Sequence, residues 1–351
     1  MDQLQRNARA RLPAPVSEYF DQGAGASFST GEAVAAWDRI RLRPRMLRDV
    51  SSVSTSTTVL GQPLATPVCV APTALQRAAH PDGELATARG VAASGSLMAV
   101  SNNSGTSFAQ IAGTGVRWWQ QVYVYRDRAL TTAMLERGRE AGASAVVLTV
   151  DTPVVGRKHN AGQSVWDMVP DDYLLANVDR AGIAEDALVY ADDLTPDTVG
   201  WLRDVTGLPV VVKGVVRADD ARTLVAAGAS AVQVSNHGGR QLDLAVATAD
   251  ALPEVAAAVQ ESGAEVYVDG GIRRAEHVLG ALALGARAVF VGRPVLWALA
   301  AGGDSGQGGS DGVAALLATL TDSLGHVMRL AGVRSTGEIT RDLVSCPEEC
   351  G

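Results

Sequence analysis

The sequence predicts a closed barrel of eight parallel strands and eight helices, the (β/α)8 fold, on three observations. Eight short runs rich in Val, Ala and Leu follow an N-terminal segment, residues 1–62. Stretches with apolar residues at helical spacing separate these runs, so strand and helix alternate along the chain. Glycines and polar residues follow the runs directly, and this is where such a barrel carries its binding and catalytic groups.

The eight runs are apolar at nearly every position, which is typical of parallel strands that helices cover. An open, doubly wound sheet is the alternative fold, but the glycine-rich dinucleotide fingerprint that usually follows its first strand is missing. In chain order the predicted strands are 66–71, 97–101, 117–124, 145–150, 209–213, 231–235, 265–269 and 288–292.

The stretches between the runs have the spacing of amphipathic helices, and most end in glycine, the residue favoured just past a helix C-terminus. Examples are LTTAMLERGREAG and RADDARTLVAAG. The interval 152–195 breaks this rhythm, because it is rich in Asp, shows no clear strand and is too long for an ordinary connection. We expect it to form a mobile lid over the mouth of the barrel.

We expect a single domain over residues 1–351, with the barrel at 63–305, including the lid, and C-terminal helices and a tail at 306–351. The tail contains Cys346 and Cys350, and we expect it to be frayed and functionally silent.

The charge balance disfavours nucleic-acid binding. The 30 basic side chains against 38 acidic ones give a formal charge of −8, whereas a nucleic-acid binder needs a basic face. No apolar stretch approaches the ~20 residues of a membrane span, and the N-terminus lacks the apolar core of a signal peptide. We therefore expect a cytoplasmic protein that binds neither nucleic acid nor membranes. Cys69 lies inside an apolar run, and we expect it to be a buried thiol.

Glycines and arginines follow the last two predicted strands. In barrels the loops at these two positions frequently bind phosphate. Glycine lets backbone N–H groups approach phosphate oxygens, and arginine supplies bidentate hydrogen bonds. The alternative is that both segments are ordinary tight turns. The candidate phosphate-binding residues are Gly271, Arg273, Gly292 and Arg293.

His237 lies in SNHGGRQLD after the sixth predicted strand, where the glycines keep the backbone uncluttered, and Arg240 can share its cavity. A His general base beside an Arg that binds a carboxylate is what removal of a proton or hydride from a hydroxy acid needs. Asp151, at the end of the fourth strand, is a candidate to orient and stabilise the imidazolium. Helix capping or pairing with Lys213 is its alternative role.

Lys213 closes the fifth predicted strand, which would place its ammonium in the barrel mouth. A buried cation there stabilises a bound ring that becomes anionic. The alternative is a structural salt bridge with Asp151 or Asp269. Tyr19 and Tyr123 offer phenol hydroxyls beside the same motifs. We expect no metal site.

An ordered set of motifs runs along the chain: APTA with HPDGELATARG, YVYRDR, TVDTP, VKG, SNHGGRQLD, DGGIRR, ALALGA and VGRPVLWALA. The set resembles the FMN-dependent α-hydroxy acid oxidases and dehydrogenases, the family of glycolate, lactate and hydroxymandelate oxidases. The resemblance runs from about Tyr19 to Gly332, nearly the whole chain, and SNHGGRQLD is its most diagnostic segment.

The resemblance implies that the barrel binds FMN and oxidises an L-2-hydroxy acid to the 2-oxo acid, after which electrons pass to O2 and give hydrogen peroxide. It implies His237 as the base, Asp151 as its partner and Tyr123 as the contact to the substrate hydroxyl. It places the substrate carboxylate at Arg240 and Tyr19. FMN would bind through its phosphate at Gly271, Arg273, Gly292 and Arg293, and elsewhere at Pro72, Thr73, Ala74, Ser101, Gln121, Thr149, Lys213, Ser235 and Asp269.

Three departures from the family pattern concern the substrate. Lys158 in GRKHN stands where the family usually has Arg, so a planar bidentate contact becomes a point charge. Asn103 stands at a pocket position that glycolate oxidase fills with Trp, which predicts a roomier and more polar pocket. The lid lacks the usual Asn-x-Phe pattern and is shorter than is typical. We therefore expect a substrate larger than glycolate or lactate, either polar or mandelate-like.

The resemblance leaves three other functions open. A dehydrogenase that uses another electron acceptor is the rival within the family, but the lid shows none of the apolar insertion of the membrane-bound members. An FMN barrel isomerase is disfavoured by His237, Arg240 and Tyr19, since a diphosphate substrate would call for more cationic residues. A flavin-binding scaffold without catalysis is disfavoured because nearly every expected acid–base residue is present. The family often forms tetramers, so we expect a homotetramer.

Overall fold

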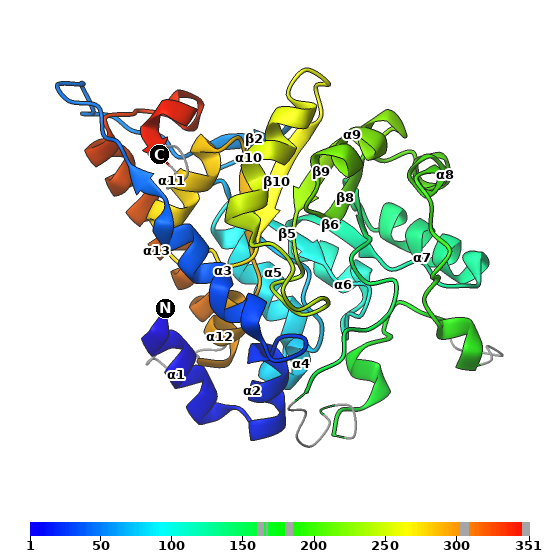
Figure 1. The fold of residues 1–351 in the computed structure, drawn as a ribbon. Helices are drawn as coiled ribbons and strands as arrows, with labels where there is room; N and C mark the ends of the chain where they lie inside the picture. Colours follow the sequence, from blue (N-terminus) through cyan, green and yellow to red (C-terminus); the bar gives the residue numbers. More distant parts are fainter. Residues whose placement is uncertain (160–164, 166–167, 180–184, 302–308, 346–351) are drawn as a thin grey trace.

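Eight parallel strands close into a barrel, and helices pack around its outside (Figure 1). The computed structural model describes residues 1–159, 165, 168–179, 185–301 and 309–345. The strand order is β10-β11-β4-β5-β6-β7-β8-β9, so the strands follow one another in chain order and the last pairs with the first. Their bounds are β4 (Val68–Val70), β5 (Leu97–Val100), β6 (Arg117–Val122), β7 (Val146–Thr149), β8 (Val210–Val215), β9 (Ala231–Val234), β10 (Glu265–Asp269) and β11 (Ala288–Val291).

The predicted barrel is confirmed, and each of its strands overlaps one of the eight predicted runs. One strand differs in length. β8 does not end at Lys213, as we expected, but continues to Val215 through a bulge between these two residues. Gly214 in the bulge has a φ of +110°, and a Cβ there would lie 2.7 Å from the Cβ of Asp151. Glycine therefore lets β8 pass close to Asp151.

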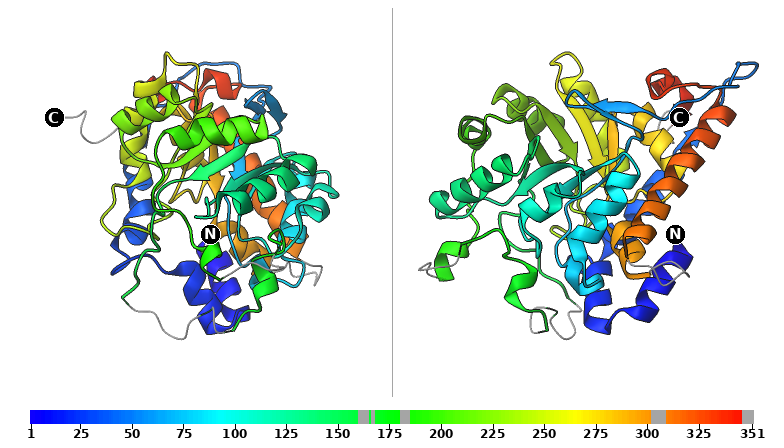
Figure 2. Two further views of the ribbon diagram at one scale, coloured as in Figure 1. Left: turned by 90° about the vertical axis from the view of Figure 1, so that its right-hand side faces the viewer. Right: turned by 180° about the vertical axis from the view of Figure 1, so that it is seen from behind.

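Helices connect the strands and surround the barrel, as Figure 2 shows from two further sides. The sequence sets their ends locally: α7 begins where the Asp127 carboxylate accepts from the backbone N–H of Ala129 at 2.9 Å, and Gly142 with φ +93° follows its end. No described helix is both long enough and apolar enough to cross a membrane. The helices are α1 (Asp2–Arg11), α2 (Ala14–Asp21), α3 (Phe28–Arg39), α4 (Gln76–Ala79), α5 (Gly83–Ala93), α6 (Phe108–Ala112), α7 (Arg128–Glu140), α8 (Asp197–Thr206), α9 (Ala218–Ala226), α10 (Thr248–Val259), α11 (Ala275–Ala283), α12 (Arg293–Ala301) and α13 (Gly309–Ala331).

Large side chains fill the inside of the barrel. Trp119 lies with its ring centroid 5.3 Å from that of Tyr267 and 5.6 Å from that of Phe290, and all three are buried. A hairpin of β2 (Thr57–Val59) and β3 (Gln62–Leu64) packs Val59 and Leu64 into the same cluster. It closes the end of the barrel where the strands begin. The opposite end, where the strands finish, stays available for a site.

The N-terminal segment reaches this open end. In α3, the Trp37 indole donates to the carbonyl of Gly270 at 2.7 Å. Gly271 has a φ of +79°, and a Cβ at this position would collide with the carbonyl oxygen of Ala33. The close packing of α3 therefore requires glycine there, independently of any ligand. After α3, β1 (Arg41–Leu42) pairs with β12 (Val344–Ser345), which follows the short 3-10 turns η4 (Thr336–Glu338) and η5 (Arg341–Leu343).

The described part of the expected lid has little regular structure. It contains the 3-10 turns η2 (Asp171–Tyr173) and η3 (Glu185–Leu188) and backbone bridges from Lys158 to Gly25 and from Tyr190 to Tyr125. Both ends of the segment are thus attached to other parts of the barrel mouth. Its mobility stays a prediction, and the tail with Cys346 and Cys350 lies outside the described residues.

Candidate active site

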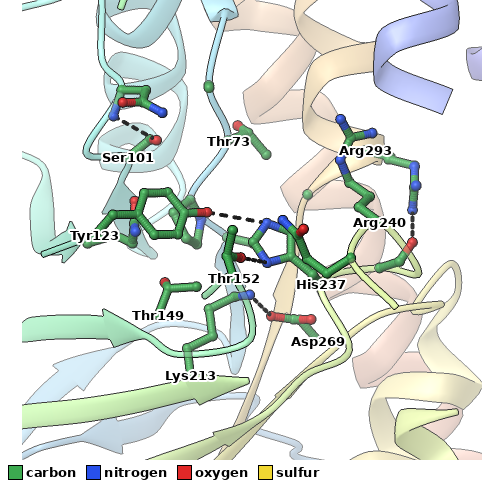
Figure 3. A pocket seen from close by; sticks show the side chains of 18 of the residues that line it. Thr73, Ser101, Tyr123, Thr149, Thr152, Lys213, His237, Arg240, Asp269 and Arg293 are labelled. Carbon is green, nitrogen blue, oxygen red and sulfur yellow. Dashed lines mark hydrogen bonds and ion pairs between the residues drawn. The ribbon is translucent and has the colours of Figure 1, made fainter. Parts of the chain in front are cut away.

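A cavity of about 480 Å³ opens at the ends of the barrel strands. Of the site residues predicted from the sequence, all but Asp151 and Ser235 line it, and these two make hydrogen bonds to residues that do. Figure 3 shows a close view of the cavity. The predicted residues that line it are Tyr19, Pro72, Thr73, Ala74, Ser101, Asn103, Gln121, Tyr123, Thr149, Lys158, Lys213, His237, Arg240, Asp269, Gly271, Arg273, Gly292 and Arg293.

The loop after β9 holds His237 in an unusual backbone conformation. His237, Gly238 and Gly239 all have positive φ, at 56°, 63° and 75°. Such a φ is uncommon for a residue with a side chain and costs free energy, so the surrounding contacts must hold it. One of these contacts is the hydroxyl of Ser235, which accepts from the backbone N–H of His237 at 3.1 Å. The turn directs the imidazole into the cavity.

The His237 imidazole lies between a carboxylate and a phenol. Its Nδ1 is 2.7 Å from Oδ1 of Asp151. Its Nε2 is 3.4 Å from the hydroxyl of Tyr123, as Figure 3 shows. Because a carboxylate only accepts hydrogen bonds, Nδ1 carries the hydrogen in the neutral ring. The lone pair of Nε2 therefore faces the cavity beside Tyr123 and is available to take a proton.

Asp151 stays ionised. Burial by itself would raise the pKa of its carboxyl, but the neighbouring charges of His237 and Lys213 outweigh burial and lower the pKa to about 2. The Asp151 carboxylate is therefore a fixed negative charge next to the imidazole, suited to stabilise an imidazolium. The same carboxylate has the opposite effect on Tyr123: burial, and then the charge of Asp151, raise the pKa of this phenol well above its usual value.

Lys213 belongs to a buried polar network. Its ammonium donates to the hydroxyl of Ser235 at 2.9 Å and lies 3.5 Å from Oδ2 of Asp269 and 4.0 Å from Oδ2 of Asp151. The hydroxyl of Ser235 in turn donates to Oδ1 of Asp269 at 2.7 Å. The structural salt bridge of Lys213 with Asp151 or Asp269, which the sequence left as an alternative, is therefore present with both residues. Lys213 also lines the cavity, so this pairing does not exclude a contact to a ligand.

Arg240 and Lys158 make one part of the cavity cationic. Nη1 of Arg240 donates to the backbone carbonyls of Tyr19 at 2.7 Å and Gln22 at 3.0 Å, at the C-terminal end of α2. Its guanidinium lies 4.7 Å from the centre of the Tyr19 ring. Burial, and then the charge of Arg240, lower the pKa of the Lys158 ammonium. This end of the cavity is suited to a carboxylate.

Arg273 and Arg293 form a second cationic region near the start of α12. Enclosure in the cavity lowers the pKa of Arg273 to about 10, and enclosure together with the charges of Arg240 and Arg273 lowers that of Arg293 to about 9. Within the described residues, neither has a carboxylate within 4.0 Å. Enclosed charges are normally paired, and a helix N-terminus also favours an anion, so the region is suited to a phosphate.

Two buried polar atoms in the cavity wall also indicate a ligand. Nε2 of Gln121 and Oγ1 of Thr149 have no hydrogen-bond partner among the described residues. Oε1 of Gln121 accepts from the backbone N–H of Asn102 at 2.8 Å, which fixes the orientation of the amide. Such atoms are rarely left unpaired in proteins, so they favour a bound molecule with polar groups along its edge.

Thr152 and Tyr190 are two of the lining residues that were not predicted from the sequence, and both contact predicted site residues. The hydroxyl of Thr152 is 3.2 Å from Oδ1 of Asp151 and 3.4 Å from Nδ1 of His237, and its position directly after Asp151 could have indicated it. Tyr190 comes from the end of the lid; its ring centroid lies 4.8 Å from that of Tyr123. Its irregular surroundings in the sequence gave no signal that it would reach the cavity.

Comparisons with known proteins extend over almost the whole chain. A family model described as FMN-dependent dehydrogenase matches residues 8–346. The chain is 42% identical to an L-lactate oxidase of Nostoc sp. over 349 residues, 95% of this chain and 94% of that protein. It is 42% identical to glycolate oxidase 3 of Arabidopsis thaliana over 353 residues, 97% of this chain and 94% of that protein. A solved structure of mandelate oxidase with (S)-4-hydroxymandelic acid has a TM-score of 0.88 and 40% identity, covering 98% of this chain and 97% of that one.

Proposed function

Because the chain belongs to the FMN-dependent dehydrogenase family and is thus an FMN-dependent oxidoreductase of 2-hydroxy acids, we propose that it oxidises an L-2-hydroxy acid larger than lactate, with O2 as acceptor and hydrogen peroxide as product. One observation carries the proposal. His237, paired with Asp151 and facing Tyr123, lies in the same cavity as Arg240. A base and a carboxylate-binding cation at one site are what a hydroxy acid requires.

The residues in the cavity fit FMN. Arg273 and Arg293 would hold its phosphate at the start of α12, where two cations are without a carboxylate partner in the described chain. When bound, FMN accepts the two electrons that leave the substrate and passes them to the acceptor. Lys213 would place positive charge beside the ring, and the unpaired groups of Gln121 and Thr149 would bind its polar edge. The other residues that we assign to FMN are Pro72, Thr73, Ala74, Ser101, Ser235, Asp269, Gly271 and Gly292.

The substrate-binding side chains have separate roles. Arg240 and Tyr19 bind the substrate carboxylate, and Lys158 adds a point charge beside them. The hydroxyl of Tyr123 contacts the substrate hydroxyl. Nε2 of His237 accepts a proton from the substrate, and the ionised Asp151 stabilises the resulting imidazolium.

The visible absorption spectrum and anaerobic reduction test this function. Purified protein should be yellow and should be bleached without oxygen by one of glycolate, lactate, mandelate or 4-hydroxymandelate, with peroxide formed when air returns. We expect mandelate-type acids to bleach it most readily. Bleaching without rapid reoxidation by air would favour the dehydrogenase alternative. A colourless protein that cannot be reconstituted with FMN would overturn the cofactor assignment.

Replacing Arg273 with methionine tests the phosphate site. We expect the Kd for FMN to rise about 10- to 100-fold, because a hydrogen-bonded charge pair is lost. Arg273 suits this test better than Arg293, because its guanidinium donates only to the adjacent carbonyl of Ile272 among the described residues. The guanidinium of Arg293 donates to the backbone carbonyls of Phe20, Gln22 and Gly238. Riboflavin has no phosphate, so its Kd should be unchanged in the variant. Arg287→Met, a change at an exposed residue before β11, is the control. An equal loss of riboflavin and FMN binding in Arg273→Met would contradict the assignment.

We also propose that the protein is a cytoplasmic homotetramer. Exposed apolar side chains from three segments gather at the barrel mouth. Hydrogen bonds connect these segments: the backbone N–H of Gly156 donates to Oε1 of Gln241, and that of Ala26 donates to Oδ2 of Asp243. Exposed apolar surface of this kind favours an interface. Replacing Leu242 and Leu244 with Asp should yield smaller assemblies in light scattering. The patch comprises Phe28, Val154, Val155, Leu242 and Leu244.

A further inference from the structure

The cavity has two chemically different ends. Figure 3 shows Arg240 on one side of the His237 imidazole and Tyr123 and Ser101 on the other. Asn103 lies beside Ser101, whose hydroxyl accepts from the backbone N–H of Asn103 at 3.1 Å. On the proposed function, on which this inference rests, the substrate carboxylate occupies the Arg240 end. The side chain of a 2-hydroxy acid then extends past Tyr123 toward Asn103.

Tyr190 fixes the amide of Asn103. The hydroxyl of Tyr190 donates to Oδ1 of Asn103 at 3.0 Å, and Nδ2 of Asn102 donates to the same oxygen at 3.4 Å. Because two donors converge on Oδ1, the amide is held with its NH2 group directed away from them. Within the described chain, Nδ2 of Asn103 has no hydrogen-bond partner, although the residue lines the cavity. The amide therefore presents unused donors.

Tyr190 is itself rigidly held. Its ring is stacked on Tyr123 at 4.8 Å and lies 5.5 Å from the ring of Tyr125. The backbone beside it pairs with the loop after β6, where Ala191 donates to Val124 at 2.8 Å and Arg126 donates to Val189 at 2.9 Å. Tyr190 also lines a second cavity of about 290 Å³, so its ring forms part of the wall between the two spaces. The far end of the substrate cavity is a fixed, polar surface.

We propose that Asn103, positioned by Tyr190, selects 2-hydroxy acids whose side chain carries a hydrogen-bond acceptor at its far end. A substrate with a para oxygen on an aromatic ring matches this surface. One that ends in a methyl group of similar size leaves the Nδ2 donors unpaired in an enclosed site. A site built to hydrogen-bond a substrate group discriminates strongly against the analogue that lacks it.

The experiment compares 4-hydroxymandelate with 4-methylmandelate on the FMN-loaded enzyme. We expect kcat/KM to favour the hydroxyl compound by about 10-fold or more in the natural enzyme, since one lost hydrogen bond to an enclosed group has this effect. In Asn103→Leu the preference should disappear. In Tyr190→Phe the stacked ring remains but the amide is released, so the preference should fall by about 3-fold or more. Tyr125→Phe is the control, because it removes a neighbouring hydroxyl that accepts from Nδ2 of Asn102 and makes no hydrogen bond to Asn103. This variant should keep the preference.

Calorimetry gives a second readout that needs no turnover. The 2-oxo acids 4-hydroxybenzoylformate and 4-methylbenzoylformate should show the same difference in Kd, again lost in Asn103→Leu. Equal affinity for the two in the natural enzyme, or an unchanged difference in Asn103→Leu, would overturn the inference. If none of the hydroxy acids reduced the flavin but the difference in binding were present, the proposed function would fail while the role of Asn103 stood.

Discussion

Replacing His237 with glutamine is expected to lower kcat by about 10²- to 10⁴-fold, which is the usual contribution of a general base. Glutamine can still donate to Asp151 and has a similar size, but it has no nitrogen that takes a proton. The cavity residues that we assign to FMN are unchanged, so the variant should stay yellow. Stopped-flow reduction by the best substrate without oxygen measures the effect directly on the step that needs the base.

His326→Gln is the matched control, because His326 is exposed on α13, outside the cavity. It should retain the natural rate of reduction. A yellow His237→Gln protein reduced at the natural rate would exclude His237 as the base. A colourless variant would instead show that His237 supports the cofactor site, and reconstitution with excess FMN separates that loss from the loss of the base.

The barrel was predictable because its signal is local. Each strand is an uninterrupted apolar run, and parallel strands under helices require this pattern. The end of β8 was not predictable in the same way. Its last residues include Gly214, which by itself indicates a strand end, and only the approach of Asp151 from β7 explains why the strand continues through a bulge. The length of β8 thus depends on a tertiary contact.

The site residues were predictable for a related reason. Strand ends converge in a closed parallel barrel, so polar residues directly after the strands must lie near one another. The contacts between them depend on side-chain direction. Tyr190 reaches the cavity from an irregular segment, where neither periodicity nor strand position indicates its direction. The last residue of SNHGGRQLD, in contrast, has a structural role: Asp243 accepts from the backbone N–H groups of Ala26 and Ser29 and supports the start of α3.

Replacing Asp151 with asparagine is expected to lower kcat on the order of 10³-fold, although the change removes almost no volume. The carboxylate of Asp151 can only accept, so it keeps the hydrogen on Nδ1 of His237 and leaves Nε2 free. The amide of asparagine can donate through its NH2 group, which favours the other tautomer, with the hydrogen on Nε2. The variant also loses the charge that stabilises the imidazolium. Thr152→Val, which removes the weaker contact to Nδ1, should have a much smaller effect.

The effect of Asp151→Asn on the free energy of unfolding depends on pH, and its sign follows from the lowered pKa of Asp151. A carboxyl with a pKa of about 2 in the folded protein and 3.8 as its ordinary value stabilises the fold above about pH 4. That stabilisation is lost as the pH falls from 4 to 2, because the unfolded chain protonates first. The difference in unfolding free energy between the natural protein and Asp151→Asn, measured by urea unfolding, should therefore shrink over this range. A difference independent of pH would show that the neighbouring charges of His237 and Lys213 do not lower the pKa of Asp151.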